Sequence, residues 1–184
     1  MREIRIPVSL EPPGLRLLPI AVVAAVLLPA LALAAPGPQV APADRLEEAV
    51  LAELNLVRLE YGRSQLKLNP RLTAAADSHT LEMVRAGYFG HESADGSHFA
   101  RRLKGFYRPN SRRAWRVGEN LIWQTERLSA RAAVAAWLAS EGHRENLLKP
   151  DFREVGIAAV RAQGAPGVYG NRCVVVLTVD FGAR

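Results

Sequence analysis

The amino-acid sequence predicts an α+β fold in which helices come first and a small antiparallel sheet comes late. Apolar residues recur with helical spacing between residues 44 and 86, in two separate segments. β-Branched apolar runs of strand length follow at residues 155–160 and 173–181, separated by glycines and a proline that suit a hairpin turn. Because the helices precede the strands, we expect one layered α+β domain.

Two long helices are predicted by their apolar spacing and by the residues at their ends. Asp44 is a suitable cap for the first helix, and Gly62 ends it. The apolar stripe of this helix comprises Leu46, Val50, Leu54, Val57 and Tyr61. The second helix is predicted from Pro70, which suits a first helical turn, to Ala86, with Gly87 just past its end.

The middle of the chain is less regular. Residues 88–117 show no clean periodicity, so we predict a long loop there with one short helix near residues 97–104. A third helix is predicted over residues 129–139, with Ser129 as its cap. The segment "GENLIW", residues 118–123, is predicted to add a third strand to the sheet.

The first 34 residues predict export from the cytoplasm. A basic start precedes an uncharged run over residues 17–35, and Ala32 and Ala34 form a small-x-small cleavage site. The alternative is an uncleaved membrane anchor, because the run is long enough to span a bilayer. We therefore expect the rest of the chain to be secreted, periplasmic or extracellular, and membrane-anchored if the segment is retained. The expected organisation is a signal peptide or anchor at residues 1–34, a Pro-rich linker at 35–45 and a folded domain at 46–184.

The chain is basic, with a formal net charge of +6, and it contains one cysteine, which excludes an internal disulfide. An exported basic protein favours anionic surfaces such as phospholipid headgroups or wall polymers, and nucleic acid is not an expected partner. Aromatic residues interleave a cluster of cations between residues 101 and 116. Such a cluster is a candidate for contact with an anionic membrane surface or envelope polymer, and the interpretation that we favour is a solvated loop tethered by its aromatic residues. The cations are Arg101, Arg102, Lys104, Arg108, Arg112, Arg113 and Arg116.

Three residues in separate polar segments are candidates for one site. They are His91 in "FGHESADG", Glu119 in "VGENL" and His143 in "ASEGHRENLL". Imidazole and carboxylate groups suit zinc and similar divalent ions, and also acid–base chemistry. The wide spacing is weak evidence by itself, since HExxH, CxxC and GxSxG motifs are absent. The simpler alternative for each residue is a structural hydrogen bond, which we expect of His79 on the apolar face of the second helix.

Five motifs, in a fixed order, carry a family resemblance. They are "LNLVRLEYG" with Asn55 and Arg58, "FGHESADG", "VGENL", "AAWLASEGHRENLL" and "VDFG". Over residues 46–182 the chain resembles the CAP superfamily, which comprises cysteine-rich secretory proteins, antigen 5 and pathogenesis-related 1 proteins and is also called the SCP domain. The bacterial, cysteine-poor branch is the most similar. The resemblance implies a three-layer α-β-α sandwich with a small antiparallel sheet and a shallow central cavity.

In the family, two histidines and two acidic residues line that cavity. The resemblance assigns the two histidines to His91 and His143, and the acid of the G-E-N motif to Glu119. The second acid normally stands three residues after the tryptophan of W-x-x-E, where this chain has Ser140. The fourth position is therefore Ser140 or the adjacent Glu141. Some family members bind zinc or another divalent cation in the cavity, so we expect it either to hold such an ion or to work without one.

Two classes of function fit the sequence, and we favour the first. As a binding module, the cavity would hold a lipid or cell-envelope ligand, with the basic segment assisting. As a metal-assisted hydrolase, it would act on peptide or envelope substrates, with Glu119 or Glu141 as the base. The sequence marks no activated nucleophile, so we lean towards a protein that is not an enzyme. We expect it to act as a monomer.

Overall fold

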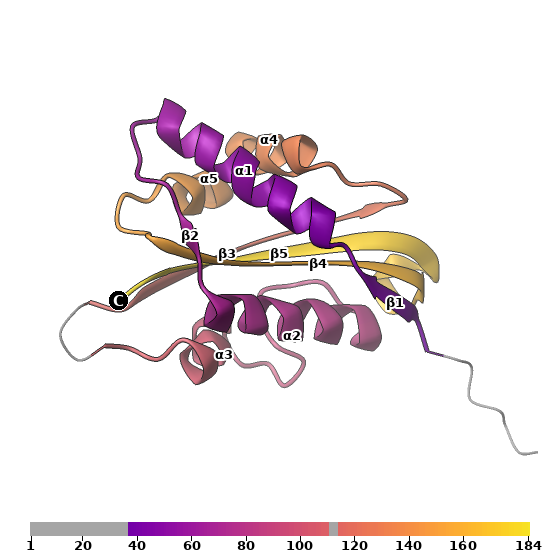
Figure 1. The fold of residues 1–184 in the computed structure, drawn as a ribbon. Helices are drawn as coiled ribbons and strands as arrows, with labels where there is room; N and C mark the ends of the chain where they lie inside the picture. The colour runs from indigo at the N-terminus through magenta and orange to yellow at the C-terminus, as the bar shows by residue number, and fades with distance from the viewer. Residues whose placement is uncertain (1–36, 111–113) are drawn as a thin grey trace, which may run out of the picture. The chain divides into compact units, whose positions relative to one another are not determined.

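The computed structural model describes residues 37–110 and 114–184, in which helices cover both faces of one sheet (Figure 1). The expected signal peptide or anchor at residues 1–34 lies outside the described residues, as do Arg112 and Arg113. Within the described ranges, no helix is both long enough and apolar enough to cross a membrane. The α+β fold predicted from the sequence is confirmed.

The described residues form a five-stranded sheet with the order β1-β4-β5-β3, and β2 pairs with β4. The strands are β1 (Gln39–Pro42), β2 (Lys67–Leu68), β3 (Arg116–Thr125), β4 (Glu154–Ala165) and β5 (Arg172–Ala183). β4 and β5 form the predicted antiparallel hairpin, whose connection contains a short 3-10 turn, Gly167–Tyr169. β3, which is also predicted, pairs antiparallel with β5 at one edge of the sheet. The pairing of β2 with β4 is parallel and covers two residues of each strand.

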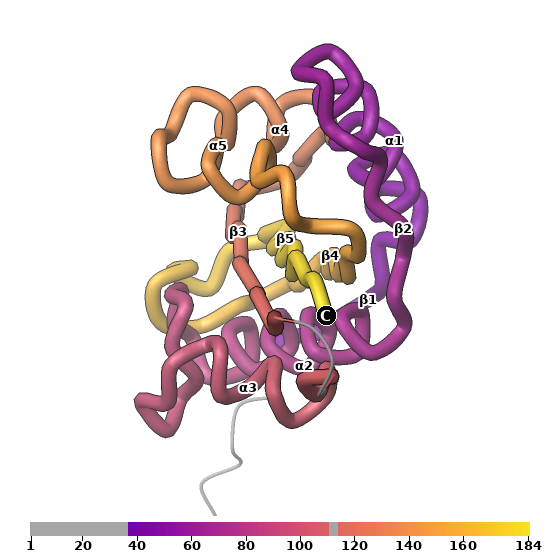
Figure 2. The backbone as a smooth tube through the Cα atoms, turned by 90° about the vertical axis from the view of Figure 1, so that its left-hand side faces the viewer, coloured from indigo at the N-terminus to yellow at the C-terminus, as the bar shows by residue number. Residues whose placement is uncertain are grey.

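Helices α1, α4 and α5 cover one face of the sheet, and α2 and α3 cover the other (Figures 1 and 2). Their bounds are α1 (Asp44–Glu60), α2 (Pro70–Ala86), α3 (Phe99–Phe106), α4 (Ala130–Ala139) and α5 (Glu141–Leu148). The three-layer sandwich implied by the family resemblance is therefore present. The sequence pattern misses α5, because this helix has only eight residues, contains Gly142 and buries little beyond Leu147.

The residues predicted at the helix ends are largely those observed. Pro70 begins α2, and Gly87 ends it with a left-handed φ of 74° that glycine adopts without strain. Ser129 caps α4 through its side chain. The prediction that Asp44 caps α1 is wrong, because Ala43 holds the cap position and makes no side-chain hydrogen bond there. Asp44 lies in the first turn instead, where its negative charge matches the helix dipole.

Part of the expected Pro-rich linker, residues 35–45, is a strand. β1 pairs antiparallel with β4, from Gln39 opposite Gln163 to Pro42 opposite Val160. β1 lies at the edge of the sheet, where a proline is tolerated because one side of the strand needs no hydrogen bonds. The linker interpretation is therefore wrong for the residues of β1, and also for the first residues of α1.

Buried apolar residues fix the helices to the sheet. The predicted stripe of α1 is buried at Val50, Leu54 and Val57. The stripe is one turn shorter than predicted, since Tyr61 is 55% exposed. On the opposite face, His79 of α2 is fully buried, and its Nε2 lies 2.9 Å from the carbonyl oxygen of Gly90. His79 is thus a hydrogen-bonded core residue, as interpreted from the sequence.

Candidate ligand-binding cavity

The structure brings His91, Glu119 and His143 together around one cavity of about 290 Å³. His91 lies in the segment between α2 and α3, Glu119 lies on β3, and His143 lies on α5. Because β3 is an edge strand, groups from both helical layers reach the cavity beside it, and Figure 2 shows β3 between α5 and α3. The remaining lining residues are Phe99, Val117, Gly118, Ser140, Gly142 and Asn146.

The G-E-N segment of β3 is locked to α5 by side-chain amides. Asn146 Nδ2 donates to the carbonyl oxygen of Glu119 at 3.1 Å and to Asn120 Oδ1 at 3.0 Å. Asn120 Nδ2 in turn donates to the carbonyl oxygen of His143 at 3.0 Å. A Cβ added at Gly118 would lie 2.6 Å from Asn146 Oδ1, so a larger residue there would displace the Asn146 side chain. These contacts fix the position of His143 relative to Glu119.

Both carboxylate oxygens of Glu119 are engaged. One oxygen lies 2.8 Å from His91 Nδ1, and the other accepts a hydrogen bond from the guanidinium of Arg102. The Glu119 side chain is fully buried, and that of Arg102 is only 7% exposed. Arg102 Nη1 also donates to Ser93 Oγ at 3.0 Å, so its guanidinium is held in place. Arg102 therefore compensates the buried negative charge of Glu119 beside the cavity.

His143 is held by the residue at the doubtful fourth position. Its Nδ1 lies 2.9 Å from Ser140 Oγ, and its ring centroid lies 6.4 Å from that of His91. Burial lowers the pKa of His143, and the nearby His91 lowers it further, so the ring is neutral near neutral pH. Ser140 lines the cavity, whereas Glu141 is exposed at the first residue of α5 and does not. The fourth position is therefore a hydroxyl group.

Sequence reasoning missed a second buried acid, Asp180. It lies on β5 directly opposite Glu119 and is fully buried. Burial raises the pKa of Asp180 well above its ordinary value, and the charge of Glu119 raises it further. The one sequence signal was the presence of an acid inside the apolar run "CVVVLTVDF". The carboxyl groups of Glu119 and Asp180 thus lie near a single cation, Arg102. Arg102 pairs with Glu119, and Asp180 favours its protonated form.

We expect Asp180→Asn to stabilise the protein at neutral pH. Above the ordinary pKa of 3.8 the unfolded chain releases this proton while the folded protein retains it. The carboxyl therefore lowers stability as the pH rises towards its folded-state pKa, and asparagine removes this loss. Melting temperatures of both proteins between about pH 4 and pH 8 measure the effect. The variant should melt a few degrees higher at the neutral end, and identical pH profiles would contradict the assignment.

The donor set does not fit a metal site in which Glu119 is the third ligand. Both oxygens of Glu119 are already in contact, one with Arg102 and the other with His91, so a metal ion bound through Glu119 would have to compete with a buried ion pair. The positive charge of Arg102 beside the carboxylate also opposes a second cation. Over residues 37–110 and 114–184, no group of three or more His, Cys, Asp or Glu side chains is arranged to hold a metal ion. The imidazoles of His91 and His143 are the nitrogen donors that the cavity offers.

The basic cluster that is a candidate for contact with an anionic surface is divided in the structure. Arg101 and Lys104 are exposed on α3. Arg108 and Arg116 line a different cavity, at the end of the sheet. Arg102 is neither an exposed surface cation nor a solvated loop residue, because it follows the inward-facing Phe99 by one helical turn and is turned towards Glu119. The members of the cluster that the structure describes therefore do not lie together on one element or around one cavity.

Comparison with known proteins agrees with the motifs and the fold. The model of the family described as CAP, the cysteine-rich secretory protein family, matches residues 51–181. The Bacillus subtilis (strain 168) protein YkwD is 30% identical over 120 residues, which is 63% of this chain and 43% of YkwD. The membrane protein YlbC from the same strain is 29% identical over 115 residues, which is 62% of this chain and 32% of YlbC. The chain thus aligns with less than half the length of these relatives.

Solved structures share the fold. An extracellular protein containing a SCP domain, from Bacillus anthracis str. Ames, has a TM-score of 0.59 and 24% identity, covering 77% of this chain and 41% of that chain. An outer surface protein from Borrelia burgdorferi has a TM-score of 0.63 and 18% identity, covering 80% of this chain and 98% of that chain. Since the family model matches most of the sequence and the layers are the same, this chain belongs to the cysteine-rich secretory protein (CAP) family.

Proposed function

We propose that this chain is an exported CAP-domain binding module whose His91/Glu119/His143 cavity receives the polar group of a lipid or cell-envelope ligand. The Bacillus anthracis protein is described as extracellular and the Borrelia burgdorferi protein as an outer surface protein. These descriptions, with the export signal expected at residues 1–34, support an extracellular location for this chain.

The observation that carries the proposal is the arrangement of the two imidazoles. The Nδ1 atoms of His91 and His143 lie 2.8 Å from Glu119 and 2.9 Å from Ser140, so each ring has a fixed orientation and keeps Nε2 for a ligand. The ring of Phe99, with its centroid 6.2 Å from that of His91, adds an apolar wall. A few convergent polar groups beside an apolar wall are typical of ligand pockets. A volume of about 290 Å³ suits a headgroup or a sugar rather than a whole lipid.

The alternative is a metal-assisted hydrolase acting on peptide or envelope substrates. One contact favours hydrolysis, since the hydrogen bond between Ser140 and His143 resembles that of a nucleophile with its base. However, Glu119 is held in a buried ion pair with Arg102, which disfavours its taking a proton from a water molecule, and Glu141 is outside the cavity. In the described part of the chain, no carboxylate contacts His143 to orient it as in a catalytic triad. Binding is the function that this geometry supports best.

We expect His143→Ala to weaken ligand binding about tenfold or more, because it removes one of the two fixed imidazoles. The probes are muropeptides and short-chain phosphatidylglycerol, and binding is measured from chemical-shift changes of the imidazole resonances during titration. The matched control is Glu145→Ala, since Glu145 is an exposed residue of the same helix, α5, and does not line the cavity. This control should bind as the wild-type protein does.

The same preparations distinguish binding from hydrolysis. A binding module should leave every probe chemically intact, as checked by mass spectrometry after incubation. Turnover that disappears in His143→Ala while affinity is unchanged would establish the hydrolase instead. Equal affinity of the wild-type protein and His143→Ala for every probe would exclude the cavity as the binding site.

A further inference from the structure

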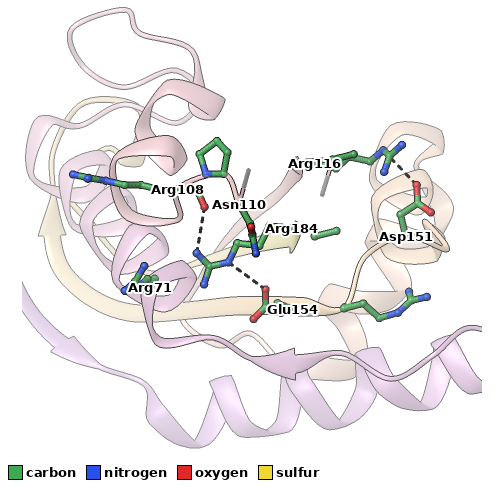
Figure 3. A pocket seen from close by; sticks show the side chains of 11 residues that line it. Arg71, Arg108, Asn110, Arg116, Asp151, Glu154 and Arg184 are labelled. Carbon is green, nitrogen blue, oxygen red and sulfur yellow. Dashed lines mark hydrogen bonds and ion pairs between the residues drawn. The ribbon is translucent and has the colours of Figure 1, made fainter. Parts of the chain in front are cut away.

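A second cavity, of about 850 Å³, lies at the end of the sheet where β4 begins and β5 ends (Figure 3). It shares no lining residue with the His91/Glu119/His143 cavity. Five arginines are among the described residues that line it, namely Arg71, Arg108, Arg116, Arg153 and Arg184. The acids among those lining residues are Asp151 and Glu154. The lining side chains that the structure describes therefore carry three more positive than negative charges.

The centre of this arginine pocket is built by Arg184, which lies between Arg108 and Glu154 in Figure 3. Its guanidinium lies over the ring of Tyr107, 4.2 Å from the centroid, and donates to the carbonyl oxygen of Arg108 at 3.2 Å. Its Nε lies 3.9 Å from Glu154, beyond hydrogen-bond distance. Glu154 accepts its hydrogen bonds from the Tyr107 hydroxyl and from Asn69 Nδ2 instead. Arg184 is thus held in place while its charge is only partly compensated.

Three other guanidinium groups of the pocket lack a carboxylate partner among the described residues. The side chains of Arg71 and Arg108 make no hydrogen bond or ion pair with those residues, and Arg153 donates only to backbone carbonyl groups. Arg116 pairs with Asp151 at 3.4 Å, but both side chains are about half exposed, so solvent screens this pair. Most of the positive charge in the pocket is therefore available to an anion.

A further cation lies behind the pocket wall. The buried guanidinium of Arg58 donates to the carbonyl oxygen of Phe152 at 3.2 Å, and Arg153 donates to the same oxygen at 2.9 Å. Burial lowers the pKa of Arg58 to about 10, and the positive charges of Arg153 and Arg63 contribute to the lowering. The positive charges of Arg58 and Arg153 thus lie close together around a neutral carbonyl oxygen. An anion bound in front of Arg153 would reduce the repulsion between them.

We propose that the arginine pocket binds a phosphate group carried by a phosphorylated cell-envelope molecule. Guanidinium groups bind phosphate oxygens through paired N–H donors, and a concave wall of one charge sign concentrates anions. An excess of three charges matches a phosphomonoester or successive phosphodiesters better than a single carboxylate. The inference does not rest on the function proposed for the His91/Glu119/His143 cavity. The phosphate group is common to soluble and lipid sources, which the experiment separates.

The test compares two double variants of the whole protein that lose the same charge. Arg71→Ala with Arg108→Ala removes the two arginines of the pocket whose side chains make no hydrogen bond or ion pair with the described residues. Arg101→Ala with Lys104→Ala removes two exposed cations of α3 outside the pocket. Binding of glycerol 1-phosphate is measured by calorimetry at constant ionic strength, and binding to phosphatidic acid vesicles by flotation against phosphatidylcholine vesicles. The unrelated variant His143→Ala is carried through both measurements.

The pocket variant should bind about tenfold more weakly, while the α3 variant and His143→Ala change binding less than about twofold. Binding in the glycerol 1-phosphate arm identifies a soluble phosphate ligand, and binding in the vesicle arm alone identifies a lipid headgroup. If both double variants lose the same binding affinity, the effect comes from net charge and not from the pocket, and the proposal is overturned. Absence of wild-type binding in both arms would overturn it as well. Melting temperatures of the variants exclude unfolding as the cause.

Discussion

Arg102→Ala is expected to unfold more readily than the wild-type protein, by about 3 kcal/mol near neutral pH. The Glu119 carboxylate is fully buried, and Arg102 is its cationic partner. Without the guanidinium, a buried carboxylate would face a second buried acid, Asp180, with no compensating charge. Removing one partner of a buried pair is costly because the other remains desolvated and unpaired.

Equilibrium unfolding in urea measures this loss. The matched control is Arg101→Ala, because Arg101 is the adjacent residue of α3 and is exposed. We expect the control to change stability by less than about 0.5 kcal/mol. The stability of Arg102→Lys should lie between those of Arg102→Ala and Arg101→Ala. Lysine keeps the positive charge, but it lacks the planar guanidinium that contacts Glu119 and Ser93 at the same time. A loss in Arg102→Ala no larger than in the control would contradict the buried ion pair.

Arg58→Met is expected to cost about 3 kcal/mol or more, because it removes a buried guanidinium that donates to four backbone carbonyl groups. The Arg58 side chain is fully buried. It donates to the carbonyl oxygens of Ser64, Leu147, Lys149 and Phe152. These carbonyls belong to the segment after α1, the end of α5 and the approach to β4. Methionine fills a similar volume but joins none of them.

Thermal and urea unfolding of Arg58→Met test this role. Arg45→Met is the matched control, since Arg45 is an exposed arginine on the same helix, α1. The control should remain within about 0.5 kcal/mol of the wild-type protein. If Arg58→Met behaves like the control, the backbone carbonyl groups do not depend on this guanidinium for their stability.

The long, well-marked elements of the fold could be predicted from the sequence. α2 has the bounds expected of it, because Pro70 and Gly87 act through the backbone itself at its two ends. β4 and β5 were predictable because their apolar, β-branched runs are bounded by turn residues. α5 and β1 were not, since one is short and glycine-containing and the other is proline-ended. Both are held by tertiary contacts that local periodicity does not record.

The residues of the cavity were only partly predictable. His91, Glu119 and His143 stand in motifs whose order carries the family resemblance. Asp180 lies beside Glu119 because β3 pairs with β5 in a particular register. The sequence of one strand alone does not determine that register, so this neighbour could not be predicted. Arg102 had a usable signal, because it lies one helical turn after Phe99 and therefore shares its inward face. Arg102 was instead grouped with the other cations between residues 101 and 116, so its inward orientation was not predicted.

We propose that Arg102 provides the positive charge that Glu119 requires, in place of a metal ion bound by that carboxylate. Calorimetric titration of zinc into the wild-type protein and Arg102→Ala near neutral pH tests this claim most directly. We expect weak zinc binding by the wild-type protein and at least about tenfold tighter binding by the variant, because a carboxylate beside two imidazoles becomes available as a ligand. Tight zinc binding by the wild-type protein, unchanged or weakened in Arg102→Ala, would contradict the claim.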